Sequence, residues 1–213
     1  MSKHSQLLPE LREFVAGRLG ELEQIPQARR ALLDVLVDLP GFSSDRHRPV
    51  RLVFICTHNS RRSHMAQLWA QVAARHFSVP GVEATSGGTE ATAFNPRAVA
   101  ALRRAGFAIE FFSDGKNPVY EVWYEPEMEP IQAFSKIYDE PPNPTAGFAA
   151  VMTCAAADTA CPIVSGADER IVIPYDDPKA ADGTEHEAEV YDERCAQIAR
   201  EMLYVFSEIA GKM

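Results

Sequence analysis

The sequence predicts an α/β protein, a three-layer sandwich with a central parallel sheet, preceded by a helical N-terminal extension. Two observations indicate this class. From residue 50 onwards, short runs of β-branched and aromatic residues alternate with longer segments of helical spacing. The first 45 residues show helical spacing only. We therefore expect an extension over residues 1–45 and an α/β domain over residues 50–213.

Two helices are predicted in the extension. The first has apolar residues at steps of three and four, with Ser5 as its N-cap. The second covers about residues 26–38 and ends at Pro40-Gly41, and the polar residues 43–49 form a linker. Two helices with apolar stripes are not stable alone, so they must pack on the α/β domain or on a second copy of the chain.

The α/β domain should contain four strands that are separated by helices, which favours parallel pairing. The strands are expected at residues 51–55, 82–85, 148–153 and 170–173, and the helices at about 65–77, 96–105 and 187–209. One segment departs from this alternation. Residues 119–124 and 131–138 resemble two strands, which we interpret as a hairpin inserted at about residues 115–145. An irregular surface excursion is the alternative.

Composition excludes several classes of protein. Lys plus Arg is 21 against 30 for Asp plus Glu, a net charge of −9, which argues against a general nucleic-acid binder. No run of about 18 apolar residues would span a membrane, and the polar N-terminus does not resemble a secretion signal. Four cysteines are too few for a disulfide-stapled secreted scaffold. A reducing compartment is therefore expected, and a cytoplasmic location.

The most informative segment is a loop between the first strand and the following helix of the α/β domain. It starts with a cysteine and reaches an arginine six residues later, and it reads Cys56, Thr57, His58, Asn59, Ser60, Arg61, Arg62, Ser63. Free N–H groups at the start of a helix bind anions, and their field stabilises the thiolate of a cysteine at the same turn. Arg62 can bind two oxygens of a tetrahedral oxyanion, and Ser63 can donate to the sulfur. The spacing suits nucleophilic attack on phosphate or a similar anion, whereas a buried structural cysteine near a surface arginine is the plainer alternative.

Other candidate residues follow later strands. Asp177, before Pro178, lies after the fourth strand and is the best candidate for a general acid, with Asp176 second. Cys154 ends the third strand and Cys161 follows, so both thiols should reach the same sheet edge as Cys56, where thiol–disulfide exchange is plausible. A zinc pair is the rival interpretation, but the spacing is too long and no matching ligands follow. Cys195, within the last helix, is expected to be a core residue.

The loop and its continuation Arg61-Arg62-Ser63-His64-Met65-Ala66 resemble the low-molecular-weight protein tyrosine phosphatase superfamily, and Asp177-Pro178 is similar to its acid loop. Within that superfamily, the chain resembles most closely the thioredoxin-coupled arsenate reductases. Further motifs fall in the same order, and these are Ser86-Gly-Gly-Thr89, Asn95-Pro-Arg-Ala-Val99, Thr153-Cys154, Cys161-Pro162 and Gly183-Thr-Glu185. The resemblance covers roughly residues 50–112 and 148–210.

This resemblance implies a mechanism without a cofactor. Cys56 attacks arsenate held by the loop and Arg62, and Asp177 protonates the departing oxygen. Cys154 then attacks Cys56 and arsenite leaves, after which Cys161 attacks Cys154 to give a disulfide that thioredoxin or a similar thiol reductant reduces. Gln67 stands where potassium-binding members carry a carboxylate, so no metal site is expected.

Three functions therefore remain open on the sequence. An arsenate reductase needs the Cys154/Cys161 pair, whereas a phosphatase acting on phosphotyrosine or another phosphomonoester needs only Cys56, Arg62 and Asp177. Tyr120, Trp123 and Tyr124 of the expected hairpin are candidates for an aromatic rim in the second case. A non-enzymatic oxyanion sensor is disfavoured because the catalytic side chains are intact. The expected partners are arsenate or a phosphate ester, a thiol reductant and, through the N-terminal helices, a second copy of the chain, with no nucleic acid or membrane.

Overall fold

A computed structural model describes residues 7–43, 49–161 and 163–213 of the chain. Ser5 and most of the expected linker at residues 43–49 lie outside the described residues. None of the helices in the described ranges is long and apolar enough to cross a membrane.

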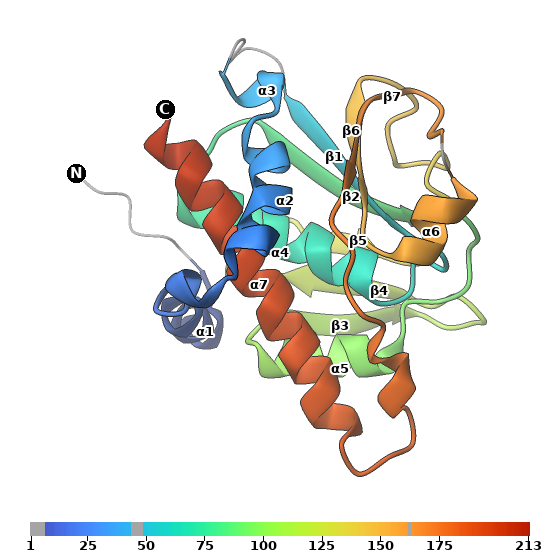
Figure 1. The fold of residues 1–213 in the computed structure, drawn as a ribbon. Helices are drawn as coiled ribbons and strands as arrows, with labels where there is room; N and C mark the ends of the chain where they lie inside the picture. Colours follow the sequence, from blue (N-terminus) through green and yellow to red (C-terminus); the bar gives the residue numbers. More distant parts are fainter. Residues whose placement is uncertain (1–6, 44–48, 162) are drawn as a thin grey trace.

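A four-stranded parallel sheet forms the centre of the molecule (Figure 1). Its strands are β1 (Val50–Cys56), β2 (Val82–Gly88), β6 (Phe148–Met152) and β7 (Ala167–Val172), in the order β2-β1-β6-β7. Every neighbouring pair in this sheet is parallel. The four strands and their parallel arrangement confirm the predicted class.

Helices cover both faces of this sheet, and alternate residues of β1 show how. Leu52 and Phe54 belong to the main apolar cluster, which includes residues of α2 (Gln27–Val37), α4 (Arg62–His76) and α7 (Glu187–Gly211). Val53 and Ile55 belong to a second cluster with Ala157 of α6 (Ala155–Ala160). The apolar run of β1 is therefore buried on both faces, as expected for a central parallel strand.

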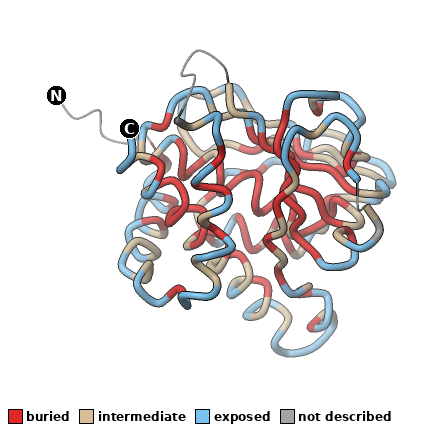
Figure 2. The backbone as a smooth tube through the Cα atoms, turned by 45° about the horizontal axis from the view of Figure 1, so that its top comes forward, coloured by how far each residue is buried: buried red, intermediate tan, exposed pale blue. Residues whose placement is uncertain are grey.

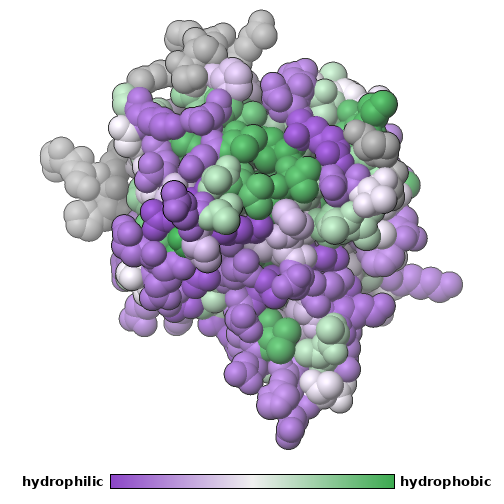
Figure 3. Space-filling view, viewed as in Figure 1, coloured by the Kyte–Doolittle hydropathy of each residue, from purple (hydrophilic) through white to green (hydrophobic). Residues whose placement is uncertain are grey.

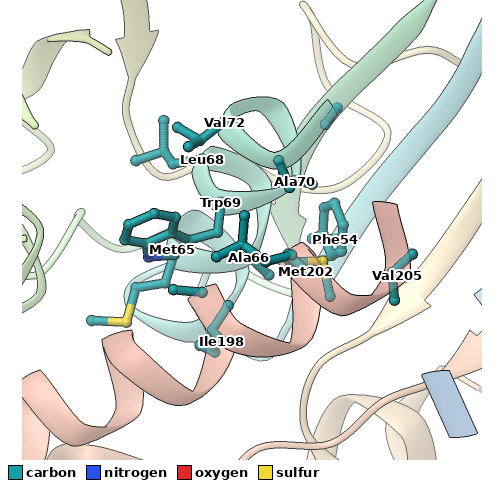
Figure 4. Close-up of a cluster of buried hydrophobic side chains, with 14 of the residues drawn as sticks. Phe54, Met65, Ala66, Leu68, Trp69, Ala70, Val72, Ile198, Met202 and Val205 are labelled. Atoms are coloured by element: carbon teal, nitrogen blue, oxygen red, sulfur yellow. The ribbon is translucent and has the colours of Figure 1, made fainter. Parts of the chain in front are cut away.

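The helix that follows β1 is embedded in the main core. Met65, Ala66, Trp69 and other residues of α4 pack against Ile198, Met202 and Val205 of α7 (Figure 4). The tube view shows the same pattern, with buried backbone at the centre and exposed backbone at the loops and helix ends (Figure 2). The core therefore holds the start of α4, where the loop from Cys56 to Arg62 (the oxyanion loop) ends.

The N-terminal helices pack on the α/β domain. The first, α1 (Pro9–Leu19), and α2 both contact α7, and a short 3₁₀ helix, η1 (Leu22–Gln24), joins them. Their buried apolar residues are Leu11, Val15, Leu33, Leu36 and Val37. A four-residue helix, α3 (Pro40–Ser43), follows α2. The sequence predicted that these helices pack on the α/β domain or on a second copy of the chain, and in the structure they pack on the α/β domain.

A second, antiparallel sheet follows α5 (Pro96–Arg104) and contains three strands rather than the two that were expected. They are β3 (Ala108–Ser113), β4 (Val119–Trp123) and β5 (Ile131–Ala133), in the order β3-β4-β5. The second expected strand was too long, because the chain leaves the sheet after Ala133 and makes only one bridge, from Ile137 to Gly88. This bridge brings residues 134–138 against the main sheet.

Candidate active site

The candidate site lies where the strand order reverses, beyond the carboxyl ends of β1 and β6. The chain passes from β1 outward to β2 on one side, and β6 then pairs with β1 on the other. Such a reversal opens a crevice at the carboxyl ends of parallel strands, where ligands bind in open α/β sheets. Cys56 ends β1, and Cys154 lies two residues after β6.

The loop from Cys56 to Arg62 is held in a tight turn around Asn59. Asn59 has φ of +42°, a conformation that asparagine tolerates better than most residues. Its amide donates to Ser63 Oγ over 2.9 Å and accepts from the backbone N–H of Lys136 over 3.0 Å. Gly88 packs so closely on the loop that a Cβ there would lie 2.7 Å from the Asn59 nitrogen. The sequence placed Asn59 in the loop that follows Cys56, but it did not reveal the contact with Lys136.

Ser63 is placed to act on the sulfur of Cys56. Its Oγ lies 3.1 Å from Cys56 Sγ. Because Asn59 already donates to that oxygen, the hydroxyl proton of Ser63 is free to point at the sulfur. A donor at this distance stabilises a thiolate, and it also stabilises sulfur as a leaving group.

Arg62 is the first residue of α4 and bridges the loop to the segment after β7. Its Nη1 donates to the carbonyl oxygen of Tyr175, and its Nη2 donates to Asp177 Oδ2, both over 2.8 Å. Its buried Nε has no hydrogen-bond partner within the described chain. The backbone N–H groups of residues 58–61 likewise donate to no described backbone or side-chain acceptor. These donors converge on one turn at a helix N-terminus, which is an arrangement that binds oxyanions.

Asp177, not Asp176, reaches the site. Its second carboxylate oxygen accepts from the backbone N–H of Lys179, and it caps the short 3₁₀ helix η2 (Pro178–Ala181). The Asp177 side chain is one-third exposed, so it can exchange a proton with water. Asp176 is almost fully exposed and lies 3.7 Å from Arg194, away from the loop.

The remaining cysteines occupy different environments. Cys154 is buried at the N-cap of α6, where its sulfur accepts from the Ala157 N–H and lies 3.5 Å from Thr57 Oγ1. Cys161 is half-buried at the other end of α6. All four cysteines are free thiols. Cys195 is buried in the core as expected; burial raises its pKa to about 12, and Trp69 donates to its sulfur.

The other loop residues act mainly through their backbones or point away from the anion site. The carbonyl of His58 accepts from Ser135 and Thr92, and its ring pairs with Glu90 at 3.1 Å. Ser60 donates to the carbonyl of Ala93, and the Thr57 carbonyl accepts from Thr89. These contacts support the loop from the turn after β2 and from the segment after β5.

Arg61 takes part in a hydrogen-bond chain that the sequence did not reveal. Its Nε donates to the Tyr191 hydroxyl over 2.9 Å, and that hydroxyl donates to Asp182 over 2.8 Å. Burial and the bond to Asp182 raise the pKa of Tyr191 to about 12, so it stays a neutral donor. The guanidinium of Arg61 also lies 3.9 Å from both Asp177 and Asp182. The chain thus joins the oxyanion loop to the acid loop and to α7.

The sequence also missed a buried pair of basic groups behind the loop. Lys136 is 4% exposed, and burial lowers its pKa to about 8. His64 is fully buried, and burial together with the charge of Lys136 holds its pKa well below the ordinary value. The imidazole stacks on Phe94 and lies 3.3 Å from Ser86 Oγ. No local pattern distinguishes such a lysine from one on the surface.

The expected aromatic rim is wrong. Tyr120 is buried and packs on Phe94 and Phe111, because its ring faces the core side of the antiparallel sheet. Tyr124 lies at the other end of α4 from Arg62, where its carbonyl accepts from the N–H of Leu8. A helix of this length separates its two ends by roughly 20 Å. Trp123 precedes Tyr124 and pairs with Ala108 on β3.

Comparison with known proteins gives consistent matches. The family model described as low molecular weight phosphotyrosine protein phosphatase matches residues 51–118. An arsenate reductase of Bacillus licheniformis is 29% identical over 158 residues, which are 74% of this chain and 94% of that protein. An arsenate reductase of Halalkalibacterium halodurans is 27% identical over 64% of this chain and 79% of its own length. A low molecular weight phosphotyrosine phosphatase from Vibrio cholerae O395 shares the fold, with a TM-score of 0.51, 13% identity, and coverage of 74% of this chain and 95% of that one.

Proposed function

We propose that the chain is a thioredoxin-coupled arsenate reductase of the low-molecular-weight protein tyrosine phosphatase superfamily, because the family model and the curated relatives that match it are of these two kinds. The observation that carries this proposal is the position of Cys154, whose sulfur lies 3.5 Å from the hydroxyl of Thr57, the residue after Cys56. Hydrolysis of a phosphate ester does not require a second thiol at this place, because water resolves the phosphoryl-cysteine. A reductase needs one, because a thiol must take over the sulfur of the nucleophile when arsenite leaves.

The first step is attack on arsenate. The thiolate of Cys56 bonds to arsenic, and one arsenic–oxygen bond breaks. Asp177 supplies the proton with which that oxygen leaves as water. The N–H groups of the loop and the free Nε of Arg62 bind the remaining oxygens, so the charge that develops on them is stabilised.

The second and third steps transfer oxidation from arsenic to the thiols. The Cys154 thiolate attacks the sulfur of Cys56, the sulfur–arsenic bond breaks, and its electron pair reduces As(V) to As(III), which leaves as arsenite. Cys161 then attacks the sulfur of Cys154 and frees Cys56 as a thiolate. The N–H of Ala157 donates to Cys154 Sγ over 3.3 Å and thereby holds this sulfur at the start of α6, on the side of the loop that carries Thr57.

Helix α6 must open for the third step. Cys154 and Cys161 flank its six residues, so at 1.5 Å per residue their Cα atoms are separated by roughly 10 Å. A disulfide needs roughly 4.4 to 6.8 Å between Cα atoms. The product disulfide is thus a second conformation of this segment, which a thiol reductant such as thioredoxin must then recognise. Such a relay requires a reducing compartment such as the cytoplasm.

Hydrolysis of a phosphomonoester is the second candidate, and one observation favours it. Cys56, Arg62 and Asp177 form a complete set for attack on phosphorus and protonation of the leaving oxygen, without the other two thiols. Against phosphotyrosine, the aromatic residues expected at the rim lie elsewhere. For a homodimer through the N-terminal helices, the exposed Leu32 and Val35 of α2 are the candidate contacts.

A substitution of Cys161 separates the two candidates. We expect Cys161→Ser to abolish multiple turnover of arsenate with thioredoxin, while hydrolysis of an aryl phosphate stays within about two-fold, since Cys161 takes no part in the first step. After one turnover, this variant should hold a disulfide between Cys56 and Cys154, seen by peptide mass spectrometry. Cys195→Ala is the matched control and should keep both activities, because Cys195 lies in the core.

Two results would contradict the proposed reductase function. If Cys161→Ser reduces arsenate through many turnovers as the wild type does, the relay is wrong. If the wild type hydrolyses the ester, forms no disulfide between Cys154 and Cys161 and produces no arsenite, the phosphatase function replaces the proposal.

A further inference from the structure

A partly buried arginine of the N-terminal extension, 15% exposed, contacts the segment that leads into the acid loop. Arg29 lies on α2, and its Nη1 donates to the carbonyl oxygen of Pro174 over 3.0 Å. Its guanidinium carbon lies 4.7 Å from the centre of the Tyr175 ring. Pro174 and Tyr175 immediately precede Asp176 and Asp177. The extension therefore contacts the backbone that precedes Asp177.

The guanidinium is itself fixed by a carboxylate in the core. Its Nε and Nη2 donate to the two oxygens of Glu201 on α7 over 3.0 and 2.7 Å, a bidentate pair. Glu201 is 2% exposed and also accepts from Gln197. Burial alone would lower the pKa of Arg29, but the hydrogen bond and the charge of Glu201 raise it, so the cation persists. Because Glu201 holds Nε and Nη2 on one edge of the planar guanidinium, the remaining nitrogen, Nη1, points at the Pro174 carbonyl in a fixed direction.

The peptide unit between Pro174 and Tyr175 is consequently held at both ends. Its oxygen accepts from Arg29, and its N–H donates to the carbonyl of Thr153 over 3.0 Å. The next carbonyl along the chain, that of Tyr175, accepts from Nη1 of Arg62, and Asp177 accepts from its Nη2. If this peptide unit rotated, the Tyr175 carbonyl and the Asp177 carboxylate, which both accept from Arg62, would move together.

We infer that Arg29 is a positioning residue for the oxyanion site: through Pro174 and Tyr175 it sets the orientation of Arg62 and Asp177. This inference rests on the proposed roles of those two residues, although it concerns oxyanion binding and not the fate of arsenic. A buried ion pair contributes little net stability compared with apolar residues of similar volume, whereas its geometry is specific. The N-terminal extension thus contributes to the site as well as to the core.

Arg29→Lys is the informative variant. Lysine keeps a positive charge opposite Glu201, but its single ammonium cannot hold both carboxylate oxygens and the Pro174 carbonyl in one plane. The matched control is Tyr204→Phe, which removes a 2.8 Å hydrogen bond between the same two helices, to Asp34, without touching residues 174–177. If Arg29→Lys does not fold, Arg29→Met combined with Glu201→Leu removes both buried charges and tests the same bond.

The measurement is protection of Cys56 from iodoacetamide by inorganic phosphate, with melting temperatures recorded for each variant. We expect Arg29→Lys to weaken phosphate binding about ten-fold and Tyr204→Phe to leave it unchanged, because a small displacement of Arg62 weakens oxyanion binding strongly. Unchanged phosphate affinity in a folded Arg29→Lys protein would overturn the inference, even if the melting temperature falls. If phosphate does not protect wild-type Cys56, the oxyanion site on which the inference rests is absent. A wild type that binds phosphate but reduces no arsenate would refute the reductase proposal and leave this inference standing.

Discussion

Lys136 brings a buried positive charge close to the oxyanion loop. Its ammonium lies 3.5 Å from the Phe134 carbonyl and 4.8 Å from the centre of the Phe134 ring, and no described carboxylate pairs with it. Its backbone N–H, and not its side chain, holds Asn59. The charge therefore costs free energy that the loop geometry does not require, since burial without a partner disfavours the charged form.

This cost gives a dependence of stability on pH. Burial lowers the pKa of Lys136 from 10.5 to about 8. Between these values the unfolded chain binds a proton that the folded chain has released, so the stability contributed by this group rises with pH across that window. We expect Lys136→Met to raise the free energy of unfolding at pH 7 by about 1 to 2 kcal/mol and to flatten its rise from pH 8 to 10.5. Urea denaturation over this range measures both effects, and the exposed Lys116→Met serves as the control. A loss of stability at pH 7 would show that the ammonium is favourably placed.

Single residues also show where inference from the sequence stops. The predicted roles of Cys56, Arg62 and Ser63 rest on their spacing within one loop. Residues so close in the chain also lie close together in the fold, so the local pattern was sufficient. The contacts of Arg29, Arg61 and Lys136 join segments that lie 70 or more residues apart in the chain. No local pattern encodes such pairs, so they required the structure.

Helix α6 separates the two relay thiols and is held at its far end by Arg170 of β7. Nη2 of Arg170 donates to the carbonyl of Asp158 over 2.8 Å and pairs with the Asp158 carboxylate. Its Nε donates to the carbonyl of Cys161 over 3.2 Å. Opening of α6 for disulfide formation must break these contacts. Arg170 should therefore slow the step that joins Cys154 to Cys161.

Substitution of Arg170 tests this restraint. We expect Arg170→Met to form the disulfide between Cys154 and Cys161 about five-fold faster under limiting diamide, since roughly 1 kcal/mol of hydrogen bonding is lost from the closed state. Arg51→Met is the matched control, because Arg51 lies on β1 and pairs with Glu83 at the surface. Quenched time points analysed by peptide mass spectrometry give the rate. An unchanged or slower rate in Arg170→Met would mean that α6 opens without releasing this arginine.

Elements of strong periodicity were predictable, and short ones were not. The strands of the main sheet and the helices α4, α5 and α7 match the alternation read from the sequence. Helix α6 was missed because six small residues carry no periodicity, and its ends are fixed by the Cys154 sulfur and by Arg170. Strand β3 was missed because Phe111 and Phe112 are consecutive and both exposed, so that it lacks the alternation of a half-buried strand.

In the whole molecule, the N-terminal helices complete the core that supports the site. Leu33 and Leu36 of α2 are fully buried in the main cluster, which also contains Ile173 and Tyr175 between β7 and Asp177. The sequence predicted that these helices must be covered, but it did not show by what. Figure 3 shows a largely hydrophilic face with an apolar area over α2 and the neighbouring edge of the sheet. The inner face of α2 thus stabilises the domain, while part of its outer face stays apolar.

Two adjacent leucines of α2 provide a direct test of this arrangement. Leu33 is 0% exposed and Leu32 is 42% exposed, so they differ in environment but not in chemistry. We expect Leu33→Ala to lower the free energy of unfolding by about 2 to 4 kcal/mol, because it removes buried methyl groups and leaves a cavity. Leu32→Ala should change it by no more than about 0.5 kcal/mol, since alanine has the higher helix propensity and little buried area is lost. Chemical denaturation of both variants measures the difference. Equal effects of the two substitutions would contradict the docking of α2 on the α/β domain, whereas the expected difference would place the extension inside the cooperative unit that carries Cys56.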